Sequence, residues 1–136
     1  MRSKAAIQLE VNKPLIVDEL EFPDPKPYQV TLKLLSSGVC HSQLHQMDKP
    51  RNRRPMVLGH EGVGIVTRVG REVRHVVEGD HAIITWVPRT PIRGRLKAEP
   101  CGATYRKELV HGLQFTWAED AQIDSEFVIP ISKEHP

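Results

Sequence analysis

The stretch that decides the fold is Gly59-His60-Glu61-Gly62-Val63-Gly64-Ile65-Val66-Thr67-Arg68-Val69. Its β-branched residues predict a strand over 62–69, with two glycines near the start of that strand. These glycines do not form a dinucleotide-binding fingerprint, because Thr67 stands where G-x-G-x-x-G needs its third glycine. We interpret them as positions that relieve packing where the strand begins.

Short apolar or alternating segments on both sides of this stretch predict further strands. Residues 30–34, Val-Thr-Leu-Lys-Leu, alternate as a strand with one buried face does. Other candidate strands are residues 5–9, 15–20, 82–87, 118–123 and 127–131, and one short helix is expected over Ser42 to Met47. Eleven prolines and nine glycines interrupt the chain often, so we predict a mainly β barrel or sandwich with little helix.

The segment from Pro88 to His111 differs from the rest of the chain. Proline and glycine interrupt it, and it is rich in basic residues: Arg89, Arg93, Arg95 and Lys97. Long stretches of this kind without a strand or helix pattern are typical of functional or mobile loops. We therefore expect a long surface loop over this segment.

The bulk composition is that of one soluble domain spanning residues 1–136. The chain is 39% hydrophobic and 26% charged, and its net charge of +2 is too small to indicate a nucleic-acid partner. It contains no stretch of the roughly 20 apolar residues that a membrane-spanning helix needs, and no apolar leader at its start. With only two cysteines, far apart, we expect a reduced, cytoplasmic protein without a membrane partner.

Cys40 and His60 are the residues with the clearest potential for metal chemistry. A thiolate and an imidazole are ligands that zinc prefers, and a catalytic zinc takes three protein ligands plus water or substrate. Cys40 follows a predicted strand and His60 precedes one, so a barrel could bring both to one rim. Ser42 and His45 could pass a proton from a metal-bound alcohol to water. Spacing alone supports this zinc site only weakly, since a lone cysteine is more often simply packed.

Three ordered motifs add weight to this interpretation: 38–42, Gly-Val-Cys-His-Ser; 58–66, Leu-Gly-His-Glu-Gly-Val-Gly-Ile-Val; and 77–83, Val-Glu-Gly-Asp-His-Ala-Ile. Together they resemble the zinc-dependent alcohol dehydrogenases of the medium-chain dehydrogenase/reductase superfamily. The resemblance implies a GroES-like, partly open β-barrel, which is the catalytic domain of those enzymes.

The resemblance also implies roles for individual side chains. Cys40 and His60 would be zinc ligands, and Glu61 would lie close to the metal and could displace its water. Ser42 would hydrogen-bond the alcohol oxygen, and His45 would complete the proton relay. His41 would be a basic residue near the cofactor pyrophosphate. Trp86 would form a wall of the substrate pocket, where its large ring favours small alcohols.

The chain departs from the family pattern in three ways. The third zinc ligand, a cysteine, and the domain that binds NAD or NADP would lie beyond Pro136. Gln43 replaces an acidic residue that supports a ligand histidine, a loss that costs on the order of 10–100-fold in metal affinity or activity. Only Cys101 lies where the family has its four-cysteine lobe, so we expect no structural zinc.

The leading expectation is therefore the catalytic domain of an oxidoreductase that transfers hydride between a small primary or secondary alcohol, or its aldehyde, and NAD or NADP. We expect this chain alone to bind zinc weakly and to be inactive. A separate chain could supply the nucleotide-binding domain, and the protein could form a homo-oligomer. Two alternatives stay open: a zinc-free domain like those of quinone and enoyl reductases, and a non-enzymatic binding module that uses the bare domain interface.

Overall fold

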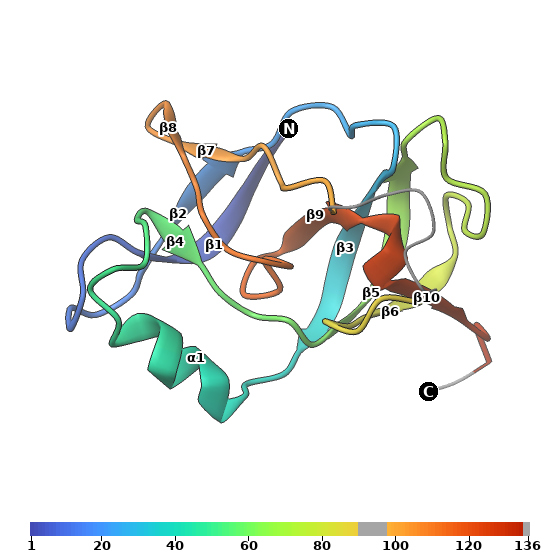
Figure 1. Cartoon of the computed structure of the whole chain (residues 1–136). Helices are drawn as coiled ribbons and strands as arrows, with labels where there is room; N and C mark the ends of the chain where they lie inside the picture. Colours follow the sequence, from blue (N-terminus) through green and yellow to red (C-terminus); the bar gives the residue numbers. More distant parts are fainter. Residues whose placement is uncertain (90–97, 135–136) are drawn as a thin grey trace.

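Two antiparallel sheets form the protein, which we describe from a computed structural model covering residues 1–89 and 98–134. Within these residues each sheet has five strands (Figure 1). The first, in spatial order, contains β4 (Met56–Val57), β1 (Arg2–Gln8), β2 (Ile16–Glu21), β7 (Thr104–Tyr105) and β8 (Glu108–Leu109). The second contains β10 (Val128–Ile131), β6 (His81–Ile84), β5 (Gly62–Val69), β3 (Gln29–Ser37) and β9 (Asp120–Asp124). A 3₁₀ turn, η1 (Ser125–Phe127), precedes β10.

The residues just before β9 join the two sheets into a partly open barrel. The Ala6 backbone N–H donates to the Trp117 carbonyl at 2.8 Å, and the Glu119 N–H donates to the Lys4 carbonyl at 2.8 Å. On its other side the Glu119 carbonyl accepts from Leu34 in β3, also at 2.8 Å. This segment therefore pairs with a strand of each sheet, and the predicted mainly β, barrel-like fold is confirmed.

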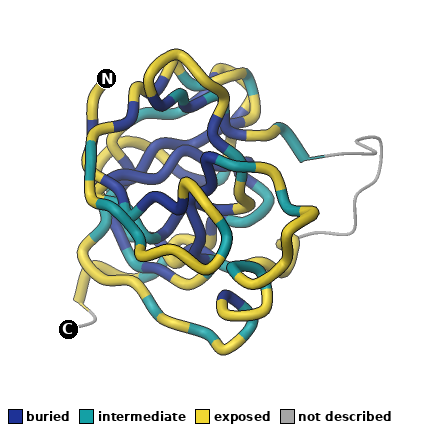
Figure 2. The backbone as a smooth tube through the Cα atoms, turned by 90° about the vertical axis from the view of Figure 1, so that its left-hand side faces the viewer, coloured by how far each residue is buried: buried dark blue, intermediate teal, exposed yellow. Residues whose placement is uncertain are grey.

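Two buried clusters fill the interior, one against each sheet. Figure 2 shows the buried residues, in dark blue, in the middle of the molecule with exposed ones around them. Alternating burial along β1 puts Ala5 and Ile7 in the first cluster, as a strand with one buried face requires. The second cluster lies against β3, β5 and β6 and includes Leu32, Val66 and Ile84. These packed sheets provide the rigid frame for the loops at their ends.

Strand β5 has the bounds predicted from the sequence, Gly62–Val69. A Cβ at Gly64 would lie 2.5 Å from the carbonyl oxygen of Lys33 in the neighbouring strand β3. This close approach of two backbones supports the interpretation that the glycine relieves packing. Strand β6 is shorter than predicted, because it ends at Ile84 rather than at residue 87.

The sequence predicts a surface loop over residues 88–111, of which residues 90–97 lie outside the described residues. For residues 101–110 the prediction is wrong. Strands β7 and β8 form a hairpin within it. Four of its side chains are buried in the first cluster: Cys101, Ala103, Tyr105 and Val110. These apolar side chains pack inward, while the charged residues at the tip of the hairpin are exposed: Arg106, Lys107 and Glu108.

The helix α1 (His41–Met47) connects the end of β3 to the loop before β4. Its buried residue is Gln43. At its C-terminal end the guanidinium of Arg54 donates to the Met47 carbonyl at 2.8 Å, which satisfies a free carbonyl of the last turn. Among the described residues no helix is long and apolar enough to cross a membrane.

Candidate metal centre

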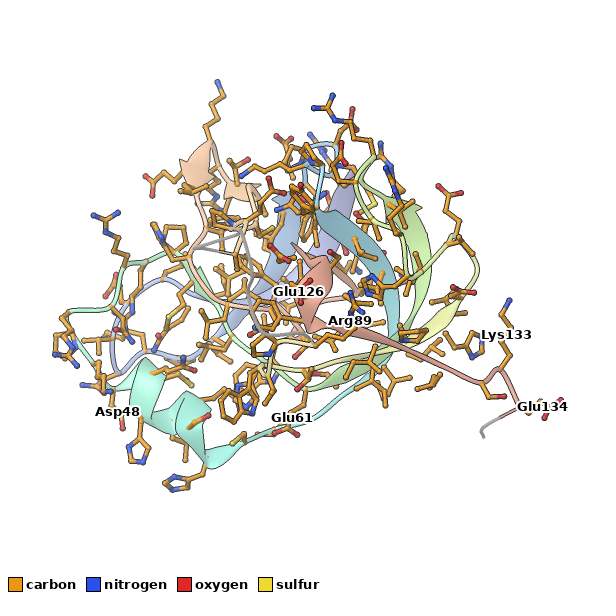
Figure 3. The ribbon with its side chains drawn as sticks, turned by 45° about the vertical axis from the view of Figure 1, so that its right-hand side comes forward. Asp48, Glu61, Arg89, Glu126, Lys133 and Glu134 are labelled. Carbon is orange, nitrogen blue, oxygen red and sulfur yellow. The ribbon has the colours of Figure 1, made fainter. Side chains whose placement is uncertain are left out.

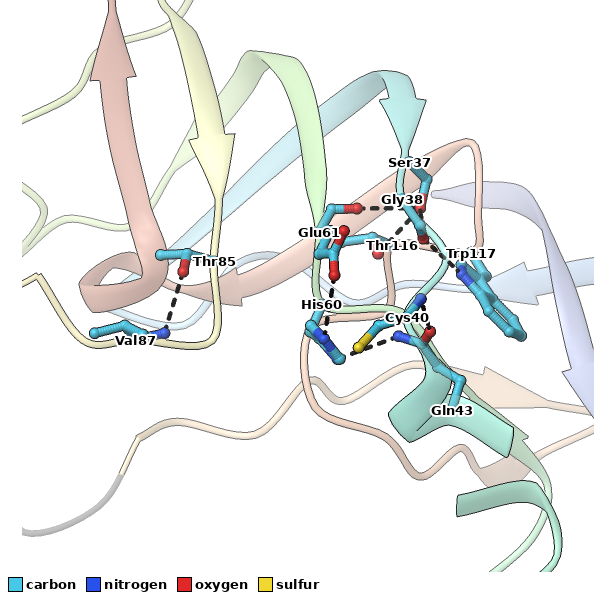
Figure 4. Close-up of polar contacts among 10 residues, drawn as sticks. All are labelled: Ser37, Gly38, Cys40, Gln43, His60, Glu61, Thr85, Val87, Thr116 and Trp117. Carbon is cyan, nitrogen blue, oxygen red and sulfur yellow. Dashed lines mark hydrogen bonds and ion pairs between the residues drawn. The ribbon is translucent and has the colours of Figure 1, made fainter. Parts of the chain in front are cut away.

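Cys40, His60 and Glu61 come together where β3 ends and β5 begins (Figure 4). These strands pair antiparallel, with Ser37 opposite Gly62, so the residues after one strand lie beside the residues before the other. One ligand atom from each of the three side chains lies within 4.8 Å of the others. The strand register therefore brings together residues that are twenty positions apart.

Two glycines shape the backbone around these side chains. The Gly38 N–H donates to the Glu61 carbonyl at 3.0 Å, and a Cβ at Gly38 would overlap the Glu61 side chain. Gly59 has φ of +97°, in the left-handed region, which glycine adopts at no steric cost. The turn at Gly59 immediately precedes His60 and aims it at Cys40.

The imidazole of His60 is held on both sides. Its Nε2 lies 3.6 Å from Glu61 Oε1, and its Nδ1 lies 3.2 Å from the side-chain nitrogen of Gln43. The His60 side chain is only 13% exposed, whereas that of Glu61 is 50% exposed. Figure 3 shows Glu61 on the side of the molecule that carries α1. One ligand is thus fixed, and the carboxylate has room to move.

The three side chains fit a zinc ion by number and by type. A thiolate, an imidazole and a carboxylate are all ligands found at zinc sites. Tetrahedral zinc places its ligand atoms roughly 3.3–3.8 Å apart, so the widest pair would need to close by only about 1 Å. Beside them a cavity of about 350 Å³ is lined by Cys40, Ser42, Gln46, His60, Trp86 and Leu113. A fourth ligand could enter from this cavity.

The structure gathers four of the predicted site residues, Cys40, Ser42, His60 and Trp86, at this cavity. Ser42 Oγ is buried and makes no hydrogen bond within the described residues. Trp86 is 63% exposed and also lines a neighbouring cavity of about 480 Å³ with His60 and Glu61.

The loop that carries Trp86 is held to η1. The Arg89 N–H donates to the Glu126 carbonyl at 2.6 Å, and the Arg89 guanidinium lies 3.8 Å from the Glu126 carboxylate (Figure 3). The loop is thereby tied to the second sheet on the side away from α1.

Two other predicted residues lie on the solvent side of α1. His41 and His45 are both exposed, and their rings meet edge to face with centroids 4.9 Å apart. Neither ring bonds the Ser42 hydroxyl, for which the described part of the chain offers no partner. Any proton relay from Ser42 to His45 would therefore need a bridging water or another hydroxyl group between them.

Cys101 is a packed core residue and does not join the metal ligands. It lies in the first cluster with Leu20 and Phe22, and it is 7% exposed. Burial raises the pKa of its thiol to about 11. A thiol with this environment is inert at neutral pH, so Cys101 is not a substitute ligand.

Sequence reasoning missed Thr116 and Trp117, which brace the site from a distant segment. Thr116 Oγ1 accepts a hydrogen bond from Ser37 Oγ at 3.2 Å, beside the start of β5. Trp117 contacts the backbones on both sides of the site. No motif signals these residues, because they act through pairing with segments almost 80 residues away.

This geometry agrees with comparisons to known proteins. A model of the alcohol dehydrogenase GroES-like domain matches residues 26–133 of the chain. The chain belongs to this family. The motifs around Cys40 and His60 both fall inside the matched residues, so the resemblance noted from the sequence is confirmed.

Proteins similar in sequence to this domain are longer than it and are named as dehydrogenases. Over 88 residues it is 40% identical to the class-3 alcohol dehydrogenase of Drosophila melanogaster, a match that covers 63% of this chain and 23% of that protein. It is 44% identical over 85 residues to the S-(hydroxymethyl)glutathione dehydrogenase of Synechocystis, with 61% and 23% covered. The chain therefore spans about a quarter of the length of the curated relatives it matches.

Solved structures share the same fold. An alcohol dehydrogenase zinc-binding domain protein from Burkholderia ambifaria superposes with a TM-score of 0.85 at 22% identity, over all of this chain and 43% of that one. The benzyl alcohol dehydrogenase of Acinetobacter calcoaceticus superposes with a TM-score of 0.81 at 22% identity, over 100% and 42%.

Proposed function

We propose that this domain provides the metal-binding and substrate-binding half of a zinc-dependent oxidoreductase acting on small primary or secondary alcohols and their aldehydes. The observation that carries the proposal is the convergence of Cys40, His60 and Glu61 ligand atoms within 4.8 Å. The nicotinamide cofactor, NAD or NADP, would be held by a domain outside residues 1–136, either further along a longer chain or on a separate chain.

Each residue around the site has a part in this reaction. Cys40 and His60 would hold the metal, and Glu61 would approach or leave it. Zinc, when bound, supplies a Lewis acid that lowers the pKa of a coordinated alcohol oxygen. Ser42 Oγ has no hydrogen-bond partner among the described residues, so it could accept a hydrogen bond from the substrate hydroxyl and, as it takes that proton, release its own hydroxyl proton toward His45.

The cavity favours small substrates. Its volume of about 350 Å³ lies at the lower end of the range of small-molecule sites, and the Trp86 ring occupies one wall. Trp86 and Leu113 would keep water from the reacting carbon, from which hydride passes to the nicotinamide. His45 would return the proton to solvent through a bridging hydroxyl or water, and His41 would lie near the cofactor pyrophosphate.

Metal substitution tests this proposal directly. The chelator-stripped chain is titrated with Co²⁺, whose thiolate bond gives a charge-transfer absorption. We expect a weak one-to-one complex that Cys40→Ala and His60→Ala abolish and that the matched control Cys101→Ala preserves. A cobalt spectrum that survives Cys40→Ala would refute the centre. Tight zinc, or alcohol oxidation by this chain alone, would contradict the expected weak and inactive state.

The same geometry bears on the two alternatives. A zinc-free reductase domain does not need a thiol, an imidazole and a carboxylate close together. Their convergence here therefore argues against that alternative. The binding module is favoured by apolar side chains exposed near the site, Val39 at 80% and Leu44 at 52%. Self-association in sedimentation velocity would support a contact surface at these side chains. A protein that stays monomeric would argue against this surface and against a homo-oligomer.

A further inference from the structure

The amide of Gln43 lies between Cys40 and His60 and contacts both. Gln43 is fully buried on α1. Its Oε1 accepts a hydrogen bond from the Cys40 backbone N–H at 2.5 Å, and its Nε2 lies 3.2 Å from Nδ1 of His60 (Figure 4). One side chain thus joins the backbone of one proposed ligand to the ring of the other.

The orientation of this amide is dictated by Cys40. A backbone N–H can only donate, so the Gln43 atom that faces it must be the carbonyl oxygen. Turning the amide over would set its NH₂ group against the Cys40 N–H and leave two donors facing each other. Because Gln43 is fully buried, its amide cannot turn to solvent instead. The nitrogen of Gln43 therefore faces His60.

This orientation determines where His60 carries its proton. The Gln43 nitrogen is only a donor, so Nδ1 of His60 must be the acceptor and carry no hydrogen. The proton of the neutral ring then resides on Nε2, the atom 3.6 Å from the Glu61 carboxylate. Nδ1 faces the Gln43 amide and Nε2 faces Glu61, so a metal held by Cys40, His60 and Glu61 would use the lone pair of Nε2. A metal-bound histidine donates from its other nitrogen to an acceptor.

We propose that Gln43 holds the metal-free His60 in the tautomer protonated at Nε2 and thereby opposes metal binding at Cys40, His60 and Glu61. Gln43 is a positioning residue, since it acts through His60, and the inference rests on the proposed function. Metal entry requires the proton to move to Nδ1, which then faces a donor. A carboxylate at position 43 would accept from both the Cys40 N–H and Nδ1–H, and would leave Nε2 free.

The substitution Gln43→Glu keeps the side-chain length and replaces the donor by an acceptor. In ¹⁵N-labelled, metal-free protein, long-range ¹H–¹⁵N spectra report which ring nitrogen of the neutral imidazole carries the proton. We expect Nε2–H for His60 in the wild type and Nδ1–H in Gln43→Glu. We also expect Gln43→Glu to bind Co²⁺ about 10–100-fold more tightly.

Two further variants separate the tautomer from charge and packing. Gln46→Glu adds the same charge on the same helix, at a residue that lines the cavity. It should leave the His60 tautomer unchanged and give less than about a third of the gain in Co²⁺ affinity that Gln43→Glu gives. Gln43→Met keeps the bulk and removes both hydrogen bonds, so it should free His60 to populate both tautomers.

Nδ1–H in the wild-type protein would overturn the proposal. So would a Gln43→Glu variant that switches tautomer but binds Co²⁺ no better than Gln46→Glu does. If neither the wild type nor Gln43→Glu binds Co²⁺ at all, the metal centre itself fails. The metal-free spectra distinguish that failure from a wrong tautomer, because they are recorded without the ion.

Discussion

Trp117 donates a hydrogen bond from its indole Nε1 to the carbonyl oxygen of Gly38 at 3.1 Å, across 79 residues of sequence. The Trp117 backbone N–H donates to the Leu58 carbonyl at 3.1 Å. Gly38 lies two residues before Cys40, and Leu58 lies two residues before His60. One residue therefore fixes the spacing between the two chain segments that carry the proposed ligands.

Replacing Trp117 by Phe should loosen this spacing while keeping most of the ring packing. The loss of one hydrogen bond should lower the free energy of unfolding by about 1 kcal/mol. We expect a Co²⁺ affinity roughly 3–10-fold lower, in the lower part of the range for groups that orient ligands. Trp86→Phe is the matched control, because it makes the same change at a residue that is 63% exposed and does not connect the Gly38 and Leu58 segments. Equal affinities for the two variants would contradict the positioning role.

Ser42→Ala should make the protein more stable. Burying a hydroxyl without a partner costs free energy, and Ser42 Oγ is such a group. We expect urea unfolding to give a gain of about 1 kcal/mol, since alanine is also the better helix former. Ser37→Ala, the same change at a hydroxyl bonded to Thr116 and to the Glu61 carbonyl, should instead lose stability. A loss in Ser42→Ala would mean that its hydroxyl has a partner.

The two thiols should differ sharply in reactivity. Cys40 borders the cavity, whereas Cys101 is buried with a thiol pKa raised to about 11, so that only about 0.1% of it is thiolate at about pH 8. In the native protein a disulfide reagent should titrate one thiol quickly and the second only after unfolding. Cys40→Ala should remove the fast phase, and excess zinc should slow it. A fast phase that persists in Cys40→Ala would contradict the assignment.

Cys101 should make stability depend on pH in the alkaline range. Its folded-state pKa of about 11 is above the value of 9.0 expected without burial, so the unfolded chain loses its proton first. The contribution of Cys101 is complete below about pH 9 and is lost as the pH rises through 11, by roughly 2–3 kcal/mol in total. Cys101→Ala should therefore show a shallower alkaline decline. Parallel curves for the two proteins would contradict a buried neutral thiol.

Local sequence determined the longer strands and the identity of the proposed ligands. Strand β5 could be predicted over 62–69 because β-branching and turn residues act through neighbouring positions. The motifs around Cys40 and His60 identified the family for the same reason, since each motif is a contiguous run.

Tertiary structure alone decided the rest. The basic residues from Arg89 to Lys97 suggested a surface loop over 88–111, and only the cluster with Leu20 and Phe22 shows that four side chains of this segment are core: Cys101, Ala103, Tyr105 and Val110. The bracing by Trp117 depends on pairing between distant segments. The replacement at Gln43 is visible in the sequence, but its consequence is not. Which nitrogen of His60 carries the proton follows from the direction of one buried amide, and a backbone N–H across a folded turn sets that direction.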